Sequence, residues 1–247
     1  LGSDLAGVVE SVGKDVTRFK AGDQVFAYRS SLMGANAEYI CMPENGLVAL
    51  KPTNMTFVEA ATVPYGSLTA LNLLRKMDIQ PGQKVLINGA SGSIGSAAVQ
   101  IAKHYGAEVT GVCSTPRVDL VKTLGADKVI DYTKEDFTQN SETYDLIFDI
   151  MRKSSFSACK NSLTPNGRYL LASFKTRQLI QMMWTSLGGG KRVICAMYTD
   201  KANGLIHIKE LVEEGVIKTV IDRSFPLEQT AEAHRYFESG HKKGNIV

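Results

Sequence analysis

The residues with the clearest chemical potential lie between positions 84 and 105. An apolar run at residues 85–87 is followed by glycines at positions 89, 92 and 95, and then by apolar residues at helical spacing as far as Tyr105. Strand, glycine turn and helix in this order are typical of a dinucleotide site, because the first N–H groups of the helix bind a pyrophosphate without a charged side chain. Ala90 stands where the usual G-x-G-x-x-G pattern has its first glycine, so an ordinary strand-to-helix turn is the alternative.

The end of the next strand, at residues 108–113, indicates which nucleotide binds. Chains selective for NAD place an acidic residue there, about 20 residues further on, to accept hydrogen bonds from the ribose hydroxyls. This chain instead has Ser114, Thr115, Pro116 and Arg117. Hydroxyls and a guanidinium fork suit a 2′-phosphate, so the sequence favours NADPH over NADH. The alternative is that Arg117 is a solvated residue in the first turn of the next helix.

The patterns that must position these residues change near residue 57. Before it, short β-type segments separated by turn signals are expected at residues 7–12, 24–28, 38–43 and 46–50. After it, strands are expected at residues 84–88, 108–113, 128–131, 145–149, 168–172 and 192–196. Helices are expected at residues 58–75, 205–214 and 226–240. The fold class is therefore α/β, with a doubly wound parallel sheet of Rossmann type and a small β-rich unit.

The composition fits an enzyme and argues against several other functions. The 247 residues carry 28 Lys and Arg against 25 Asp and Glu, a balance too even to argue for nucleic-acid or membrane binding, so no nucleic-acid partner is expected. The most apolar stretch, residues 179–187, is too short and too polar to span a bilayer. Four separated cysteines indicate reduced thiols and a cytoplasmic location. The chain opens without Met in a strand-like phrase, so we expect a missing N-terminal part, and organelle targeting stays open.

Several phrases occur in the order that one protein family shows. They are residues 2–13, 20–26, 66–70, 81–95 and 240–244. Together they resemble the medium-chain dehydrogenase/reductase superfamily, and within it the zinc-free quinone oxidoreductase branch fits best. The resemblance implies a GroES-like catalytic domain in residues 1–57 whose first part is absent. It also implies a Rossmann NADP-binding domain in residues 58–217 and a C-terminal segment, residues 218–247, that returns to the catalytic domain.

The resemblance also implies which residues contact the cofactor. The residues implied for the pyrophosphate turn are Gly89, Ser91, Gly92, Ser93, Ile94 and Gly95. The residues implied for the 2′-phosphate and adenosine are Ser114, Arg117 and Tyr132. Thr69, Ile150 and Ser173 are implied for the nicotinamide end. Two of these have ordinary structural alternatives: Thr69 as a helix-interior residue bonded to the backbone, and Tyr132 as a strand-end aromatic that covers the core.

A zinc ion is not expected in this chain. Zinc-dependent relatives carry Gly-His-Glu where this chain has Gly2, Ser3 and Asp4, and a serine hydroxyl cannot replace a ligating imidazole. The resemblance therefore implies hydride transfer from NADPH to an acceptor that is already electrophilic, a quinone or an α,β-unsaturated carbonyl. A hydrogen-bond donor to the developing oxygen anion is also needed. No general acid is assigned, and Tyr65 is the candidate considered for that role.

Two other functions stay open, an enoyl-thioester reductase and an NADP(H)-binding scaffold or sensor without catalysis. The sensor is favoured by the altered turn at residues 150–153. This turn and residues 172–175 are bulkier than the corresponding turns of relatives and could partly fill the nicotinamide pocket. For assembly, we expect the strand at residues 192–196 to lie at a sheet edge. Pairing of this edge across a two-fold axis would form a homodimer that buries Val193 and Ile194.

Overall fold

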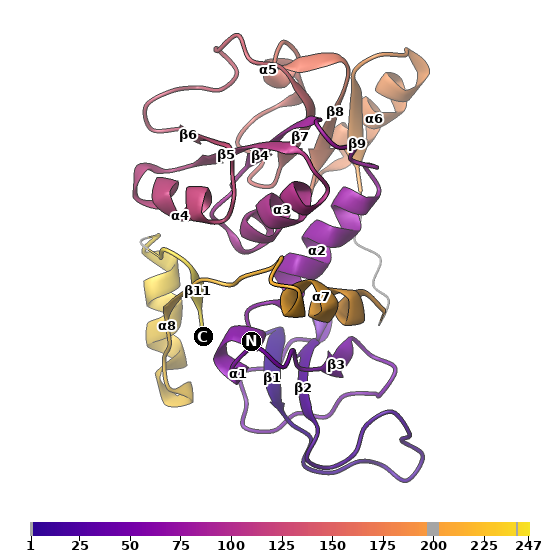
Figure 1. Cartoon of the computed structure of the whole chain (residues 1–247), viewed down its shortest axis with the longest axis vertical. Coiled ribbons are helices and arrows are strands. Elements are labelled where there is room, and N and C mark those ends of the chain that lie inside the picture. The colour runs from indigo at the N-terminus through magenta and orange to yellow at the C-terminus, as the bar shows by residue number, and fades with distance from the viewer. Residues whose placement is uncertain (1, 197–202, 241) are drawn as a thin grey trace. The chain divides into compact units, whose positions relative to one another are not determined.

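The computed structural model describes residues 2–196, 203–240 and 242–247, which form two compact units (Figure 1). Unit 1 consists of residues 1–68 and 199–247, and unit 2 consists of residues 69–198. Helix α2 (Pro64–Arg75) crosses the limit between them. The domain limits inferred from the sequence, at residues 57 and 217, remain a prediction.

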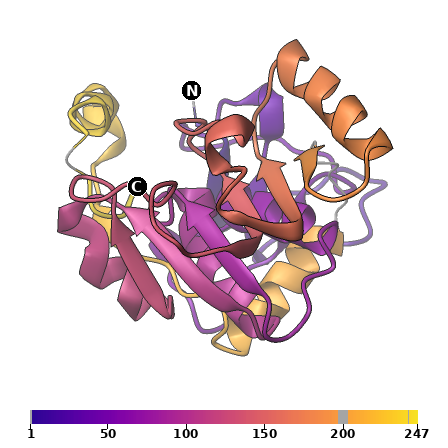
Figure 2. The ribbon, with the colours of Figure 1, turned by 90° about the horizontal axis from the view of Figure 1, so that it is seen from above.

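Unit 2 is built on a six-stranded parallel sheet with the order β6-β5-β4-β7-β8-β9. Its strands are β4 (Lys84–Asn88), β5 (Glu108–Cys113), β6 (Lys128–Asp131), β7 (Tyr144–Asp149), β8 (Leu163–Leu171) and β9 (Arg192–Cys195). They lie side by side in Figure 2. The order reverses between β4 and β7, and doubly wound sheets bind their ligands outside the carboxyl ends of the strands at such a reversal. The expected α/β class is confirmed.

Helices lie beside the sheet of unit 2. They are α3 (Ser93–His104), α4 (Val118–Thr123), α5 (Phe156–Cys159) and α6 (Thr176–Leu187), with a 3-10 turn, η2, at Thr115–Arg117. Helix α3 packs a stripe of buried apolar residues against the sheet. Val85, Leu86 and Ile87 of β4 are fully buried, as a central parallel strand requires. The core of this unit continues through Ile147 and Tyr169 of the neighbouring strands.

Unit 1 combines a small antiparallel sheet with the C-terminal part of the chain. The sheet has the order β1-β2-β3, and its buried residues are Val25, Ala27 and Val48. The elements of the unit up to α2 are β1 (Asp4–Val8), β2 (Gln24–Tyr28), η1 (Ser30–Leu32), β3 (Val48–Leu50) and α1 (Phe57–Ala60). The later elements are α7 (Asn203–Glu213), β10 (Ile221–Arg223), η3 (Leu227–Gln229), α8 (Thr230–Glu238) and β11 (Asn245–Ile246).

Three expected elements of unit 1 are wrong. Residues 38–43 form no strand, because β2 already pairs with β1 on one side and β3 on the other. The strand expected at residues 7–12 is β1, which ends at Val8. The helix expected at residues 58–75 is two helices, since Pro64 disfavours helical geometry in the residue before it and begins α2.

Candidate functional site

The glycine turn after β4 is held against the next strand and the next helix. The N–H groups of Gly89 and Ala90 both donate to the carbonyl of Val112 in β5, at 3.1 and 3.0 Å. Gly89 has a φ of 98°, a left-handed conformation that favours glycine. A Cβ on Gly95 would lie 2.1 Å from the carbonyl oxygen of Gly89, so the helix and the turn approach as closely as backbones can. Only glycine fits at this position.

The departure of this turn from the usual pattern has a structural explanation. Ala90, which replaces the first glycine, is fully buried. Its methyl group lies 3.0 Å from the point where Gly111 of β5 would carry a Cβ. Val121 Cγ1 lies nearer still, at 2.5 Å, so Gly111 leaves space that Val121 and Ala90 share.

The start of α3 supplies the anion-binding groups of the turn. The helix begins at Ser93, and its N-cap, Gly92, has no side chain to cap it. Ser91, Gly92, Ser93 and Ile94 are all half-buried. The first N–H groups of a helix carry the partial positive charge of its dipole and have no partner within the helix. The turn therefore fits a pyrophosphate, held by backbone N–H groups rather than by cationic side chains.

The three residues expected around the 2′-phosphate come together at the carboxyl ends of β5 and β6. The N–H of Arg117 donates to the carbonyl of Ser114 at 2.9 Å, and the N–H of Tyr132 donates to the carbonyl of Cys113 at 3.1 Å. Lys153, which sequence reasoning did not assign to this group, places its ammonium 5.5 Å from the centroid of the Tyr132 ring. The ring of Tyr132 is half-exposed, so it does not serve mainly to cover the core.

An acidic residue, Asp131, lies at the same edge and was missed. Its carboxylate accepts from the hydroxyls of Thr115 at 2.5 Å and Thr133 at 2.7 Å. These bonds, with the hydrogen bond from Thr115 as the largest cause, hold the pKa of Asp131 below its usual range. The hydroxyl of Thr115 is therefore engaged by Asp131, which leaves Ser114 and Arg117 as the groups of this turn that suit a phosphate. The sequence signal that could have identified Asp131 was its position as an acidic residue at the end of the strand expected at residues 128–131.

The residues expected at the nicotinamide end lie in unit 2, on three different elements. Thr69 is buried in α2, Ile150 follows β7 and donates its N–H to the carbonyl of Asn88 at 3.2 Å, and Ser173 is exposed just after β8. The side chain of Met151 lies over the glycine turn, with its Cγ 2.7 Å from the position of a Cβ on Gly89. The turn after β7, expected to carry bulkier side chains than in relatives, therefore places one of them, Met151, against Gly89.

A buried carboxylate, also missed by sequence reasoning, fixes the ends of the central strands. Asp149 accepts from the hydroxyl of Tyr169 at 2.6 Å, the side-chain amide of Asn88 at 3.1 Å and the N–H of Arg152 at 3.0 Å. Burial raises the pKa of Asp149 above its ordinary value. The bond to Arg152 holds that residue at a φ of 52°, a left-handed conformation in which side chains other than glycine are uncommon.

Tyr65 lies in unit 1, whereas the expected cofactor contacts belong to unit 2. Its N–H donates to the Asp4 carboxylate at 2.7 Å, and its ring lies 5.6 Å from that of Tyr28. Burial and then the charge of Asp4 raise the pKa of Tyr65, so its hydroxyl is a protonated donor at neutral pH. Ser3 also donates to Asp4, at 2.8 Å. Two residues of the zinc position are thus engaged in capping α2.

The described residues offer no obvious metal centre. Within residues 2–196, 203–240 and 242–247, no group of three His, Cys, Asp or Glu is placed to hold an ion. The four cysteines are free, and burial raises the pKa of Cys113 to about 11 and that of Cys159 to about 12. These two thiols are poor metal ligands because binding needs the thiolate.

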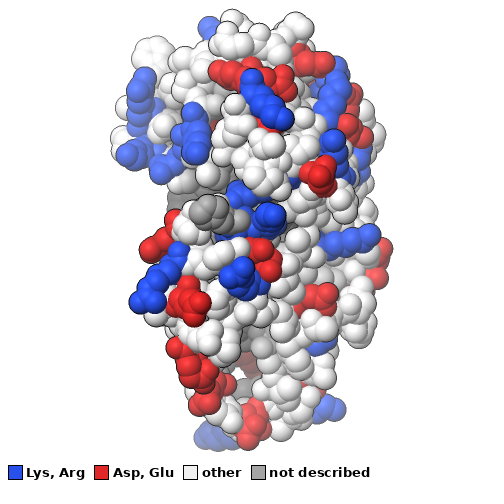
Figure 3. Space-filling model, turned by 90° about the vertical axis from the view of Figure 1, so that its left-hand side faces the viewer, with Lys and Arg blue, Asp and Glu red and all other residues white. Residues whose placement is uncertain are grey.

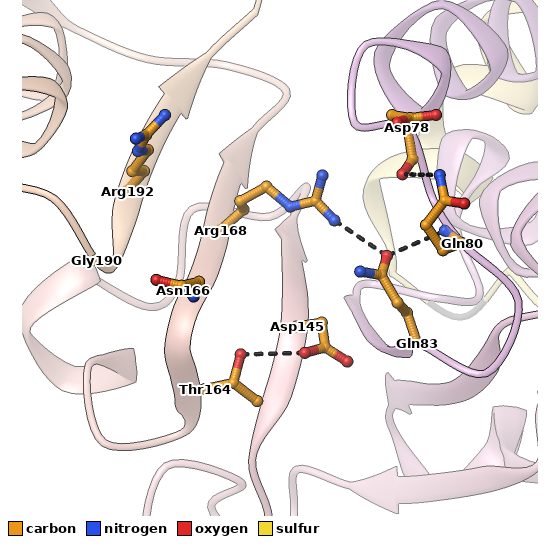
Figure 4. A pocket seen from close by; sticks show the side chains of 9 residues that line it. All are labelled: Asp78, Gln80, Gln83, Asp145, Thr164, Asn166, Arg168, Gly190 and Arg192. Atoms are coloured by element: carbon orange, nitrogen blue, oxygen red, sulfur yellow. Dashed lines mark hydrogen bonds between the residues drawn. The ribbon is translucent and has the colours of Figure 1, made fainter.

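A polar pocket of about 440 Å³ lies at the amino ends of the strands in unit 2 (Figure 4). Thr164 donates to Asp145 at 3.1 Å across it, and the guanidinium of Arg168 donates to Gln83 at 3.1 Å and to the carbonyl of Met77. Parallel sheets bind nucleotides at the opposite, carboxyl edge. Arg168 of β8 is thereby bonded to the segment before β4. The pocket lies at the edge of the sheet opposite the expected cofactor site.

The molecular surface and the helices add two observations. On the face drawn in Figure 3, acidic and basic side chains are interspersed. None of the helices that the structure describes is both long and apolar enough to cross a membrane.

Two family models match the chain. A model for the GroES-like domain of alcohol dehydrogenases matches residues 1–52, and one described as zinc-binding dehydrogenase matches residues 124–247. The chain is 34% identical over 257 residues to a chloroplastic quinone-oxidoreductase of Triphysaria versicolor. The match covers 99% of this chain and 78% of that protein.

Two further relatives agree with these matches. A chloroplastic NADPH-dependent alkenal/one oxidoreductase of Arabidopsis thaliana is 32% identical, and the match covers all of this chain but 62% of that protein. The structure resembles the quinone oxidoreductase from Coxiella burnetii with a TM-score of 0.85 and 27% identity, over 100% of this chain and 78% of the other.

Proposed function

The chain belongs to the medium-chain dehydrogenase/reductase superfamily, in its quinone oxidoreductase branch, and we propose that it reduces a quinone or an α,β-unsaturated carbonyl with NADPH and without zinc. The observation that carries the proposal is the set of groups at the carboxyl ends of β4, β5 and β6. The glycine turn fits a pyrophosphate, and Ser114 and Arg117 offer a hydroxyl and a guanidinium to a 2′-phosphate.

Different residues of this chain would contact different parts of the cofactor. When bound, the nicotinamide supplies the hydride. The N–H groups at the start of α3 hold the pyrophosphate, and Ser114, Arg117 and Tyr132 hold the adenosine end, with the ammonium of Lys153 adding positive charge. Thr69, Ile150 and Ser173 remain proposed contacts at the nicotinamide end. Tyr65 remains the candidate donor, since its raised pKa keeps its hydroxyl protonated.

The first prediction concerns Arg117. Arg117→Ala should raise the KM for NADPH about tenfold or more, because a hydrogen bond to a charged group contributes about 1.5–3 kcal/mol, and should leave the KM for NADH unchanged. Steady-state kinetics of the full-length protein with both cofactors measure this. Arg192→Ala is the matched control, since this exposed arginine begins β9 at the other edge of the sheet. Equal effects of Arg117→Ala on both cofactors would show that Arg117 does not read the 2′-phosphate.

A second prediction tests zinc independence. Dialysis of the full-length protein against a chelator should leave both turnover and the melting temperature unchanged, because Ser3 and Asp4 are engaged in capping α2. Turnover and thermal unfolding before and after dialysis are the measurements. Loss of activity that zinc alone restores would contradict the proposal.

The side chain of Met151 favours a second candidate function, an NADP(H)-binding sensor without catalysis. Met151 belongs to the turn at residues 150–153, which is bulkier than the glycine-type turn of relatives and would narrow the nicotinamide end of the site. NADPH oxidation with and without a small quinone distinguishes the two, because a sensor would bind the cofactor without acceptor-dependent oxidation. An enoyl-thioester reductase is the third candidate, and it would oxidise NADPH with a thioester acceptor in place of the quinone.

We also propose a homodimer and a compartment that keeps thiols reduced. The free cysteines agree with the cytoplasm, while the names of the relatives place those proteins in chloroplasts, so an organelle is the alternative. The expected edge position of β9 is confirmed. The expectation that Val193 faces a partner is wrong, since its side chain is already buried in unit 2. The half-buried Ile194 remains for such a contact, whereas the N–H groups of Val193 and Cys195 at this edge already donate to α6.

A further inference from the structure

Helix α6 presents its apolar side to solvent and its more polar side to the sheet. Toward β9, the hydroxyl of Thr185 accepts from the N–H of Val193 at 3.0 Å, and the sulfur of Met182 accepts from the N–H of Cys195 at 3.4 Å. These bonds cover part of the free edge of β9. Figures 1 and 2 both show α6 at the margin of the six-stranded sheet, beside β9.

The outward face of α6 is a continuous apolar stripe at helical spacing. The stripe consists of Leu179, Ile180, Met183, Trp184 and Leu187, all exposed. Trp184 is 73% exposed and Leu187 is 85% exposed. Single exposed apolar residues are ordinary, but five on one helix face mark a surface that another body covers.

The charges around this stripe select the kind of partner. Residues 150–199 contain eight Lys and Arg and no Asp or Glu, and two of the eight, Lys175 and Arg177, lie at the start of α6. Lys175 and Arg177 flank the start of α6, and both are exposed. The dipole of a helix disfavours cations at that end, so these residues are not placed there to stabilise the helix.

A second copy of the chain fits this surface poorly. Helix α6 carries no Asp or Glu, so a two-fold contact between two copies of α6 would offer Lys175 and Arg177 no acidic partner on the other helix. An apolar stripe with Trp, Met and Leu, flanked by basic residues, is instead the pattern of helices that lie in the interface of a membrane with anionic lipids. The near-neutral charge of the whole chain conceals this local excess.

We propose that α6 docks on an anionic lipid surface. The apolar stripe enters the headgroup region, and Lys175 and Arg177 face the lipid phosphates or carboxylates. The helix lies on the membrane and does not cross it, in agreement with its length of 12 residues.

The test uses Trp184, which is the only tryptophan of the chain and therefore reports on α6 alone. Full-length protein is mixed with vesicles of phosphatidylcholine, with or without phosphatidylglycerol. We expect co-sedimentation with the anionic vesicles, a blue shift of the Trp184 emission and quenching by brominated lipid chains. High salt should reverse all three, since surface charges are screened. The measurement needs neither cofactor nor acceptor, so its outcome is separate from that of the proposed reductase activity.

Variants separate the charge from the apolar contact. Lys175→Gln with Arg177→Gln should weaken binding to anionic vesicles about tenfold or more. Ile180→Ser with Leu187→Ser should abolish the blue shift. Leu227→Ser is the control, because Leu227 is an exposed apolar residue of unit 1, and it should bind as the parent does. Far-UV circular dichroism and the melting temperature of each variant confirm that the protein is folded.

Two results would overturn the proposal. One is the absence of sedimentation and of a blue shift with anionic vesicles. The other is a blue shift without vesicles that grows with protein concentration together with the mass measured by light scattering, which would assign the stripe to a second copy of the chain.

Discussion

Gly95→Ala should abolish NADPH binding and destabilise unit 2 by about 4 kcal/mol or more. The added methyl group would lie 2.1 Å from the carbonyl oxygen of Gly89 and 2.8 Å from the Cα of Ala90. Both are backbone atoms of the glycine turn, so no side chain can move aside to relieve the overlap. The turn or the first turn of α3 must shift, and the N–H groups that fit the pyrophosphate shift with it. Chemical denaturation and titration with NADPH measure the two effects.

Gly92→Ala is the control for this prediction, because it changes the same turn. Its methyl group would meet nothing closer than the carbonyl oxygen of Gly89 at 3.5 Å, an ordinary contact. We expect stability close to that of the parent, with weaker NADPH binding because a side chain now stands where the phosphate approaches. Equal stability losses in the two variants would contradict the assignment of the close approach to Gly95.

The second large effect is expected at Asp149. Asp149→Ala leaves the hydroxyl of Tyr169, the amide of Asn88 and the N–H of Arg152 without their acceptor. Each buried donor that loses its acceptor costs about 1–3 kcal/mol, so we expect a loss of about 3 kcal/mol or more in the free energy of unfolding. Tyr169→Phe removes one of the three bonds and should cost about 1–2 kcal/mol. Similar losses in the two variants would contradict separate contributions from the bonds of Asn88 and Arg152.

The same residue gives stability a pH dependence of known sign. Burial raises the pKa of Asp149 in the folded chain above its ordinary value of 3.8. The folded state therefore binds a proton more readily than the unfolded state, and the contribution of Asp149 to stability falls as pH rises through the folded pKa. Asp149→Asn should remove this slope. Denaturation curves of both proteins across the acidic range would show whether their difference changes in that direction.

The sequence predicted unit 2 better than unit 1 for a physical reason. Strands buried on both faces, such as β4, read as short apolar runs between turns and helices, and their order in the chain determines a doubly wound sheet. Unit 1 has short strands whose pairing depends on distant partners. The alternating pattern at residues 38–43 is suited to a strand, but both neighbours of β2 are already in place.

Some residues of the candidate site could likewise be identified from the sequence, and others could not. The glycine turn could be read from spacing, because its backbone geometry admits so few residue types. Asp149 and Lys153 could not, since their roles depend on residues of other segments, whereas the position of Asp131 at the end of an expected strand was a signal. The compensation of Ala90 by Gly111 is a pair of positions in neighbouring strands, and a pattern within one segment does not contain it.

The two units also differ in the order in which their parts are synthesised. Unit 2 is one uninterrupted stretch, whereas unit 1 joins residues 1–68 to residues 199–247. Within unit 1, Thr53 donates to Glu213 at 2.9 Å, and the hydroxyls of Thr62 and Thr219 share a hydrogen bond. During translation, residues 1–68 therefore cannot form these contacts until the whole of unit 2 and the segment after it have left the exit tunnel. Chaperones that bind nascent chains would meet residues 1–68 without these C-terminal partners during that interval.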